Sequence, residues 1–199
     1  MVRGRRRGAT RLEKYPILIV TNGAVTETEY LNELARRANR SDPAIHVKVK
    51  HIAGVPDTAL RKLQSPQGDV SDYREVWVVV DEDDNDLGPL VQKCAKLSRR
   101  GKTKWVAVAS RPCFEAWLVA HYEQVRKYTN QDGAKSHFAK ITVRSPNDKE
   151  LPDDFPYEAM SDAATRCRLS GSDLEPQNAL PPNPGSGMPH LLKRLGFLS

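Results

Sequence analysis

The feature that most constrains this chain is an uninterrupted apolar run, residues 76–80, that ends abruptly in carboxylates. The run shows no polar alternation, which is typical of a strand buried on both faces in the middle of a parallel sheet. The acidic residues that follow it are Asp81, Glu82, Asp83, Asp84 and Asp86. Because ligands of open α/β sheets bind beyond the carboxyl ends of the strands, the sequence predicts a functional site directly after this run.

Two of these acids are spaced to share a metal ion. In an extended segment the side chains of Asp81 and Asp83 point the same way, so both could hold one hard cation such as Mg²⁺. A solvated acidic loop without a ligand is the plain alternative. The position at the end of a central strand favours the metal site.

The rest of the first two thirds alternates between strands and helices. Residues 16–21 are expected to form a second buried strand, fully apolar over residues 17–20. Residues 45–52 alternate like an edge strand with one solvent-exposed face, and residues 105–109 are expected to form a fourth strand. Helices are expected from Thr26, where Thr26 and Glu29 resemble a capping box, and over residues 56–63 and 87–97. This pattern predicts an α/β fold, a parallel sheet of about four strands flanked by helices, with the strand 76–80 inside and next to the first strand.

A nearly apolar helix, residues 112–122, is expected after the fourth strand. Glu115 stands out in its first turn. A carboxylate there is stabilised by the helix dipole, but it also lies at the carboxyl end of the sheet, near Asp81. Glu115 is therefore a candidate metal ligand or catalytic group.

Beyond residue 122 the parallel pattern stops, and short helices separated by proline-rich links are predicted. We expect three parts: a basic arm (1–14), an α/β domain (15–125) and a helical C-terminal annex (126–199). The last segment, 188–198, carries an apolar seam that would dock on the body or on a second copy of the chain. A homo-oligomer is thus one candidate assembly.

Charge and composition indicate which partners and which cellular compartment to expect. The chain of 199 residues carries a net charge of +6, and its first 14 residues, six basic side chains against Glu13, contribute +5 of it. Nucleic acid is the expected partner of this arm, and a solubilising tail is the alternative. No apolar run could span a bilayer, and three scattered cysteines favour the reducing cytoplasm. The candidate nucleic-acid-binding residues are Arg3, Arg5, Arg6, Arg7 and Arg11.

Several ordered motifs resemble the RloB-like family, bacterial proteins linked to restriction loci and abortive phage infection. The matching stretches are residues 17–23 with Thr26, Glu27 and Tyr30, residues 80–83, residues 112–118, Asn183-Pro184 and His190-Leu191. The resemblance implies a Toprim-like fold, the metal-binding α/β domain of topoisomerases, primases and nucleases of the overcoming-lysogenization-defect type. It also implies a first-strand glutamate before a glycine and an Asp-x-Asp pair after the third strand. Asp81 and Asp83 match that pair.

The glutamate is replaced here by Asn22, an amide that cannot act as a general base. Three explanations stay open. Glu27, Glu29 or Glu115 supplies the missing carboxylate, the site binds without cutting, or the protein is a degenerate or engineered member. Asn22, Glu27 and Glu115 are accordingly the candidate catalytic residues, and Asp81, Asp83 and Glu115 the candidate ligands of Mg²⁺ or Mn²⁺.

Two classes of function follow. The first is a metal-dependent phosphodiesterase acting on DNA or RNA in phage defence. The second is a non-catalytic Toprim-like module that binds metal, nucleic acid, a nucleotide or a partner defence protein. Asn22 favours the second class and the Asp81-x-Asp83 pair the first. An ordinary α/β domain with an acidic surface is the remaining alternative.

Overall fold

The computed structural model describes residues 14–65, 70–83, 85–167 and 177–199. The arginines of the predicted basic arm, Arg3, Arg5, Arg6, Arg7 and Arg11, lie outside these residues, and so does Asp84.

The core of the fold is one mixed sheet in the order β2-β1-β3-β4-β5. The first four strands are parallel, and β5 joins β4 in the antiparallel direction. The strands are β1 (Tyr15–Thr21), β2 (Ile45–His51), β3 (Glu75–Asp81), β4 (Lys104–Arg111) and β5 (Gly185–Ser186). The expected α/β fold is confirmed, as are the interior place of β3 beside β1 and the edge place of β2. The sequence did not predict β5.

Burial of the strands follows their place in the sheet. β3 lies between β1 and β4 and is buried at every residue, whereas β2 becomes half-buried or exposed toward its end. An unbroken apolar run is stable only where both faces of the sheet are covered, which is the case at β3.

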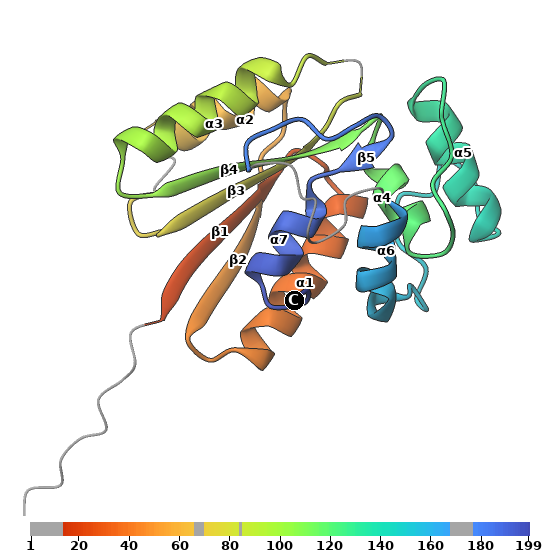
Figure 1. The fold of residues 1–199 in the computed structure, drawn as a ribbon, viewed down its shortest axis with the longest axis horizontal. Coiled ribbons are helices and arrows are strands. Elements are labelled where there is room, and N and C mark those ends of the chain that lie inside the picture. Colours follow the sequence, from red (N-terminus) through yellow and green to blue (C-terminus); the bar gives the residue numbers. More distant parts are fainter. Residues whose placement is uncertain (1–13, 66–69, 84, 168–176) are drawn as a thin grey trace, which may run out of the picture.

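Helices cover both faces and one end of the sheet (Figure 1). On one face lie α2 and α3, on the other α1 and α7, while α4, α5 and α6 gather toward the end at which the parallel strands point. The helices are α1 (Thr26–Ser41), α2 (Pro56–Gln64), α3 (Gly88–Arg100), α4 (Phe114–Ala120), α5 (Gln131–Ile141), the 3₁₀ helix η1 (Tyr157–Ala159), α6 (Met160–Arg166) and α7 (Met188–Arg194).

The two faces have separate apolar cores because alternate residues of a strand point to opposite faces. In β3, Trp77 and Val79 pack with α1, α4 and α7, whereas Val76 and Val78 pack with α2 and α3. This arrangement fixes the sheet between its two helical layers and leaves its ends for polar groups.

The capping box predicted at the start of α1 is wrong. The residue before the helix is Val25, and no side chain caps it. The Thr26 hydroxyl instead donates to the carbonyl of Lys149, and Glu29 Oε2 accepts from the backbone N–H of Leu151 at 2.8 Å. Both side chains therefore tie α1 to a loop of the C-terminal third.

The C-terminal third is joined to the sheet by β5. Ser110 and Ser186 share a buried hydroxyl hydrogen bond of 2.8 Å, and Gly187 N donates to Ala109 O at 2.8 Å. Met188, Leu191 and Leu192 of α7 then enter the same apolar core as α1. No helix among the described residues has the length and apolar character needed to cross a membrane.

Candidate functional site

The loop after β3 continues along the end of β4. Glu82 N donates to Ser110 O and Asp83 N to Pro112 O, each at 3.0 Å. Asp83 has a φ of 36°, in the left-handed region that aspartate tolerates better than most residues. The turn, rather than the extended alternation expected from the sequence, brings Asp83 to the same cavity as Asp81.

Five carboxylates line a cavity of about 370 Å³ at the carboxyl end of the sheet; Asp148 is paired with Arg144 at 3.6 Å, and four others remain. These four come from three separate places in the chain, each of which follows a parallel strand. They are Glu27, Asp81, Asp83 and Glu115, which we call the acidic cluster. The cluster includes every carboxylate that the sequence analysis proposed as a metal ligand.

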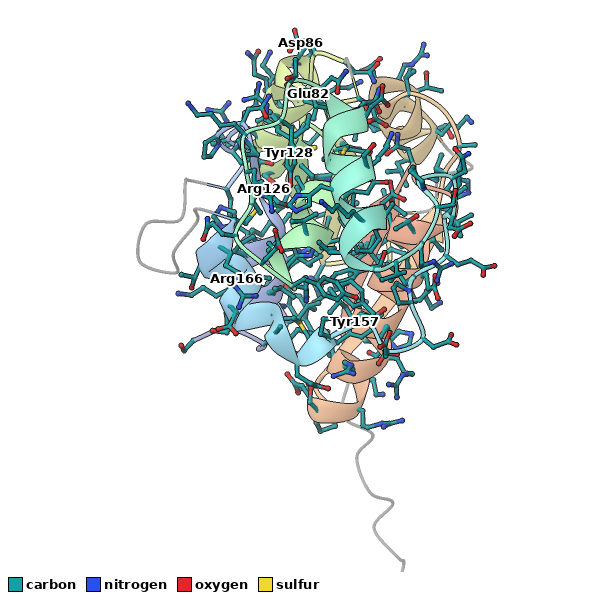
Figure 2. All side chains as sticks on the ribbon, turned by 90° about the vertical axis from the view of Figure 1, so that its right-hand side faces the viewer. Glu82, Asp86, Arg126, Tyr128, Tyr157 and Arg166 are labelled. Carbon is teal, nitrogen blue, oxygen red and sulfur yellow. The ribbon has the colours of Figure 1, made fainter. Side chains whose placement is uncertain are left out.

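Not every acid near this end belongs to the cluster. Glu82 forms an ion pair with Arg111 at 2.8 Å instead. Figure 2 looks onto this end of the sheet and shows Glu82 and Asp86 at its upper edge, with α5 lying across the centre. Glu29 lines a different, larger groove of about 850 Å³ along α1 and is not part of the cluster.

Glu27 reaches the cluster because residue 23 has no side chain. A Cβ placed on Gly23 would lie 2.0 Å from the carboxyl carbon of Glu27, so this carboxyl occupies the space that a side chain there would fill. The turn is held by Thr28 Oγ1, which donates to Gly23 O at 2.6 Å, and by Gly23 N, which donates to Thr21 Oγ1 at 3.0 Å. A carboxylate is thus present beside the position that the resemblance assigns to a glutamate.

Asn22 itself does not line the cavity. Its backbone carbonyl accepts from His51 Nε2 at 3.2 Å, and its side-chain Oδ1 is buried with no hydrogen-bond partner among the described residues. Of the three carboxylates proposed to replace the missing glutamate, Glu27 and Glu115 are in the cluster and Glu29 is not.

Burial and mutual repulsion work against ionisation of the cluster. Burial, and then the charges of Glu27, Asp83 and Glu115, raise the pKa of Asp81 well above its usual range. The backbone N–H of Phe114, at the start of α4, opposes this shift. Burial also raises the pKa of Glu27, and Glu115 and Asp83 add to the effect. These carboxylates would therefore strongly stabilise a positive charge in the cavity.

Lys135 supplies part of this positive charge. Its Nζ lies 3.5 Å from Asp83 Oδ1 and donates to Gln131 Oε1 at 2.6 Å. Partial burial works against the charge on this lysine, but Asp83 and Glu115 outweigh it and raise the pKa of Lys135. Lys135 was not predicted as a site residue, because α5 carries no strand-end signal that would connect residue 135 with the acids.

The chemistry of the cluster fits a hard divalent cation. Glu115 Oε2 is buried without a hydrogen-bond partner among the described residues, and Asp83 Oδ1 has only the Lys135 ammonium at 3.5 Å, so both oxygens are incompletely satisfied without a ligand. Carboxylate oxygens are the donors that Mg²⁺ and Mn²⁺ prefer. However, within the described part of the chain no three Asp, Glu, His or Cys side chains already have a geometry that could hold an ion. The four acids line one cavity, but their side chains do not have the geometry of a complete metal site.

One of the comparisons with known proteins gives a match. A search of curated proteins and a search of solved structures give no match to the chain. A family model described as RloB-like protein matches residues 17–195, which include all four acids of the cluster, Lys135 and both ends of the sheet. The chain therefore belongs to the RloB-like protein family.

Proposed function

We propose that the protein is a metal-dependent phosphodiesterase that cleaves DNA or RNA, with a role in phage defence as the family resemblance implies. One observation carries the proposal: the Glu27 carboxyl lies over Gly23 and shares a cavity with Asp81, Asp83 and Glu115. The carboxylate that Asn22 lacks is thereby supplied from the first turn of α1.

Buried carboxylate oxygens support the choice of metal ligands. Glu115 offers a buried oxygen without a hydrogen-bond partner among the described residues, Asp83 offers one that contacts only Lys135 Nζ at 3.5 Å, and Asp81 lines the same cavity. A bound Mg²⁺ or Mn²⁺ would polarise the phosphate and stabilise the leaving oxygen. With three protein carboxylates at most, water completes the shell, so metal affinity should be modest.

The remaining two groups suit proton transfer and phosphate binding. Glu27 lines the cavity but is not among the proposed metal ligands, and its raised pKa lets it take a proton from water more readily than an ordinary carboxylate, so we assign it the role of general base. The attacking water gives a proton to Glu27 and its oxygen bonds to phosphorus, while the bond from phosphorus to the leaving oxygen breaks and that oxygen takes up a proton from solvent water. Lys135, already held as a cation at the cavity, would contact a phosphate oxygen.

A second function is favoured by Asn22 and by the Lys135–Asp83 ion pair. If that pair persists, Asp83 is not free for metal, and the site would act as a non-catalytic module that binds nucleic acid or a partner defence protein. The two functions differ in whether Glu27 matters to chemistry.

The test compares two glutamates of the same helix turn. Glu27→Gln removes the proposed base, and Glu29→Gln makes the same chemical change outside the cluster while its amide oxygen can still accept from Leu151 N. Single- and double-stranded DNA and RNA are incubated with wild type and both variants, with Mg²⁺, Mn²⁺ or EDTA. We expect metal-dependent cleavage by wild type and by Glu29→Gln, and a loss of about 10²-fold or more in Glu27→Gln.

Calorimetric titration of Mn²⁺ into the same proteins and into Asp83→Asn supplies the second readout. Binding should weaken most in Asp83→Asn, because that change removes a proposed ligand. Cleavage that is equal in Glu27→Gln and Glu29→Gln would contradict the assigned base. If wild type neither cuts nor binds Mn²⁺, the phosphodiesterase proposal is wrong and the binding module replaces it.

A further inference from the structure

The opposite end of the sheet carries positive charge. Exposed lysine and arginine side chains surround the points at which the parallel strands begin, far from α5 in Figure 1. We call this group the amino-end surface; it consists of Lys14, Arg74, Arg99, Arg100, Lys102 and Lys104.

The topology gathers these residues. Lys14 precedes β1, Arg74 precedes β3 and Lys104 begins β4, and those three strands are neighbours in the sheet. Arg74 N donates to Pro16 O and Lys104 N to Arg74 O, each at 2.9 Å, so the three strand starts are held side by side. Neighbouring strands are about 4.8 Å apart, which sets a row of cations at short, regular intervals.

These cations are uncompensated among the described residues. None of the six forms an ion pair there, whereas Arg36, Arg37 and Arg111 elsewhere do. Among the described acids, Asp42 lies before β2, where its Oδ1 accepts from Ala44 N, and two lie beside the starts of β1, β3 and β4. Asp72 is exposed, and Glu75 is buried and already bound by Arg194 Nε at 2.8 Å and by Trp77 Nε1 at 2.8 Å. The surface therefore keeps a clear excess of positive charge.

The row borders a hollow of about 400 Å³ that also offers aromatic rings. Lys14, Arg74 and Lys102 line it together with Tyr15 and Tyr73. Tyr15 is 41% exposed, and Arg194 lies 5.2 Å from its ring centre. Cations that hold phosphates beside aromatic rings that stack on bases are the usual composition of a nucleic-acid surface.

We propose that the amino-end surface binds the phosphate backbone of nucleic acid, as a second contact separate from the acidic cluster. A strand of seven residues is about 23 Å long, so phosphates held here are about that far from the cluster at the other end. Binding at this surface should therefore need neither metal nor cleavage, and it stands even if the protein does not cut.

The experiment reverses charge at one end and then the other in the full chain. Arg74→Glu/Lys102→Glu alters the amino-end surface. Lys127→Glu/Lys140→Glu changes the net charge by the same amount on exposed lysines near α5, which makes it the matched control. Binding of a labelled duplex and a labelled single strand is measured in EDTA from about 50 to about 200 mM salt.

We expect the amino-end variant to bind about tenfold more weakly and to lose roughly 2 from the slope of log affinity against log salt, one phosphate contact for each residue. Arg74→Gln/Lys102→Gln removes the same two contacts, so it should lose the same slope but less affinity, because no repelling charge is added; thermal unfolding checks that each variant is folded.

Equal losses in the two charge-reversal variants would overturn the proposal, because binding would then follow net charge alone. An unchanged salt slope in the amino-end variant would overturn it as well. The proposal would also be overturned if wild type bound phosphatidylcholine vesicles containing phosphatidylserine, the amino-end variant did not bind them, and both proteins bound nucleic acid equally. The cleavage assay fails or succeeds independently, since it has a metal-dependent readout.

Discussion

At the scale of single residues, the site depends on which side chain fills one small space. The resemblance placed a glutamate at residue 22, and the sequence offered three replacements without a way to rank them. The structure separates them through Gly23, whose missing side chain admits the carboxyl of Glu27. Glu29, only two positions along, is bound to Leu151 N in another groove. Helix periodicity alone could not show this, because both glutamates are in the first turn of α1.

A residue outside the site yields a prediction about pH. His121 is buried, with Nδ1 3.0 Å from the carbonyl of Pro156 and Nε2 3.1 Å from the Tyr30 hydroxyl. A carbonyl only accepts, so Nδ1 carries the proton and Nε2 accepts from Tyr30. Burial, reinforced by the charge of Arg166, lowers the pKa of His121 to about 4. In the unfolded chain His121 takes up a proton near pH 6.5, whereas in the folded protein it stays neutral until about pH 4. The free energy of unfolding therefore decreases as the pH falls from about 6.5 toward 4.

The expected cost from this group is about 2 kcal/mol between pH 7.5 and pH 5. Urea unfolding at both pH values is compared between wild type and His121→Gln, which does not titrate. The carboxylates of the acidic cluster titrate in both proteins and cancel in the comparison. Wild type should lose more stability on acidification than the variant by that amount. An identical pH response in the two proteins would show that His121 takes up its proton without unfolding.

At the scale of elements, strands were easier to predict than the placement of helices. Buried strands such as residues 76–80 and 105–109 can be recognised from their apolar runs, and the acids that follow a strand can be recognised from their position. Nothing in the sequence of α5 indicates that it lies over the acidic cluster. Its start is fixed locally, by Asn130 Oδ1 accepting from Gly133 N at 3.1 Å, but its position over the sheet end depends on tertiary packing against α4. The two-residue β5 was missed for a similar reason, since Gly-Ser has little strand preference.

A test of α5 uses two lysines of that helix. Lys135→Met removes the positive charge from the acidic cluster, and Lys140→Met makes the same change on the exposed side, near the end of the helix. Without metal, we expect Lys135→Met to lose about 1 kcal/mol of stability, seen as a fall of roughly 2–4 °C in Tm, because four carboxylates then repel one another with less compensation. Lys140→Met should stay close to wild type. Added Mn²⁺ should recover most of the loss in Lys135→Met, and equal Tm values for both variants without metal would contradict this role for Lys135.

At the scale of the whole molecule, charge is divided between the two ends of the sheet. Acids follow the parallel strands, and lysines and arginines that form no ion pair within the described part of the chain precede them. Much of the acidic end could be predicted, because carboxylates directly after a buried run are conspicuous. The amino-end surface could not, because its cations come from strand starts and a helix end spread over 91 positions, from Lys14 to Lys104. Only the order of the strands in the sheet makes them neighbours.

The basic arm, residues 1–14, adds a third charged region, and its predicted role can be tested by charge alone. Two variants replace all five of its arginines, one with glutamine and one with lysine. Binding by counterion release depends on charge, so the lysine variant should keep the affinity and salt slope of wild type for a labelled duplex in EDTA. The glutamine variant should bind more weakly and lose roughly 4 from the slope, about 0.9 for each phosphate contact that disappears. The nucleic-acid affinity that remains in the glutamine variant should fall further when Arg74→Glu/Lys102→Glu is added, because the amino-end surface makes its own contacts.

If the glutamine variant binds as wild type does, the arm is a solubilising tail. If the lysine variant is as weak as the glutamine variant, the arginines act through their planar hydrogen-bonding geometry rather than their charge.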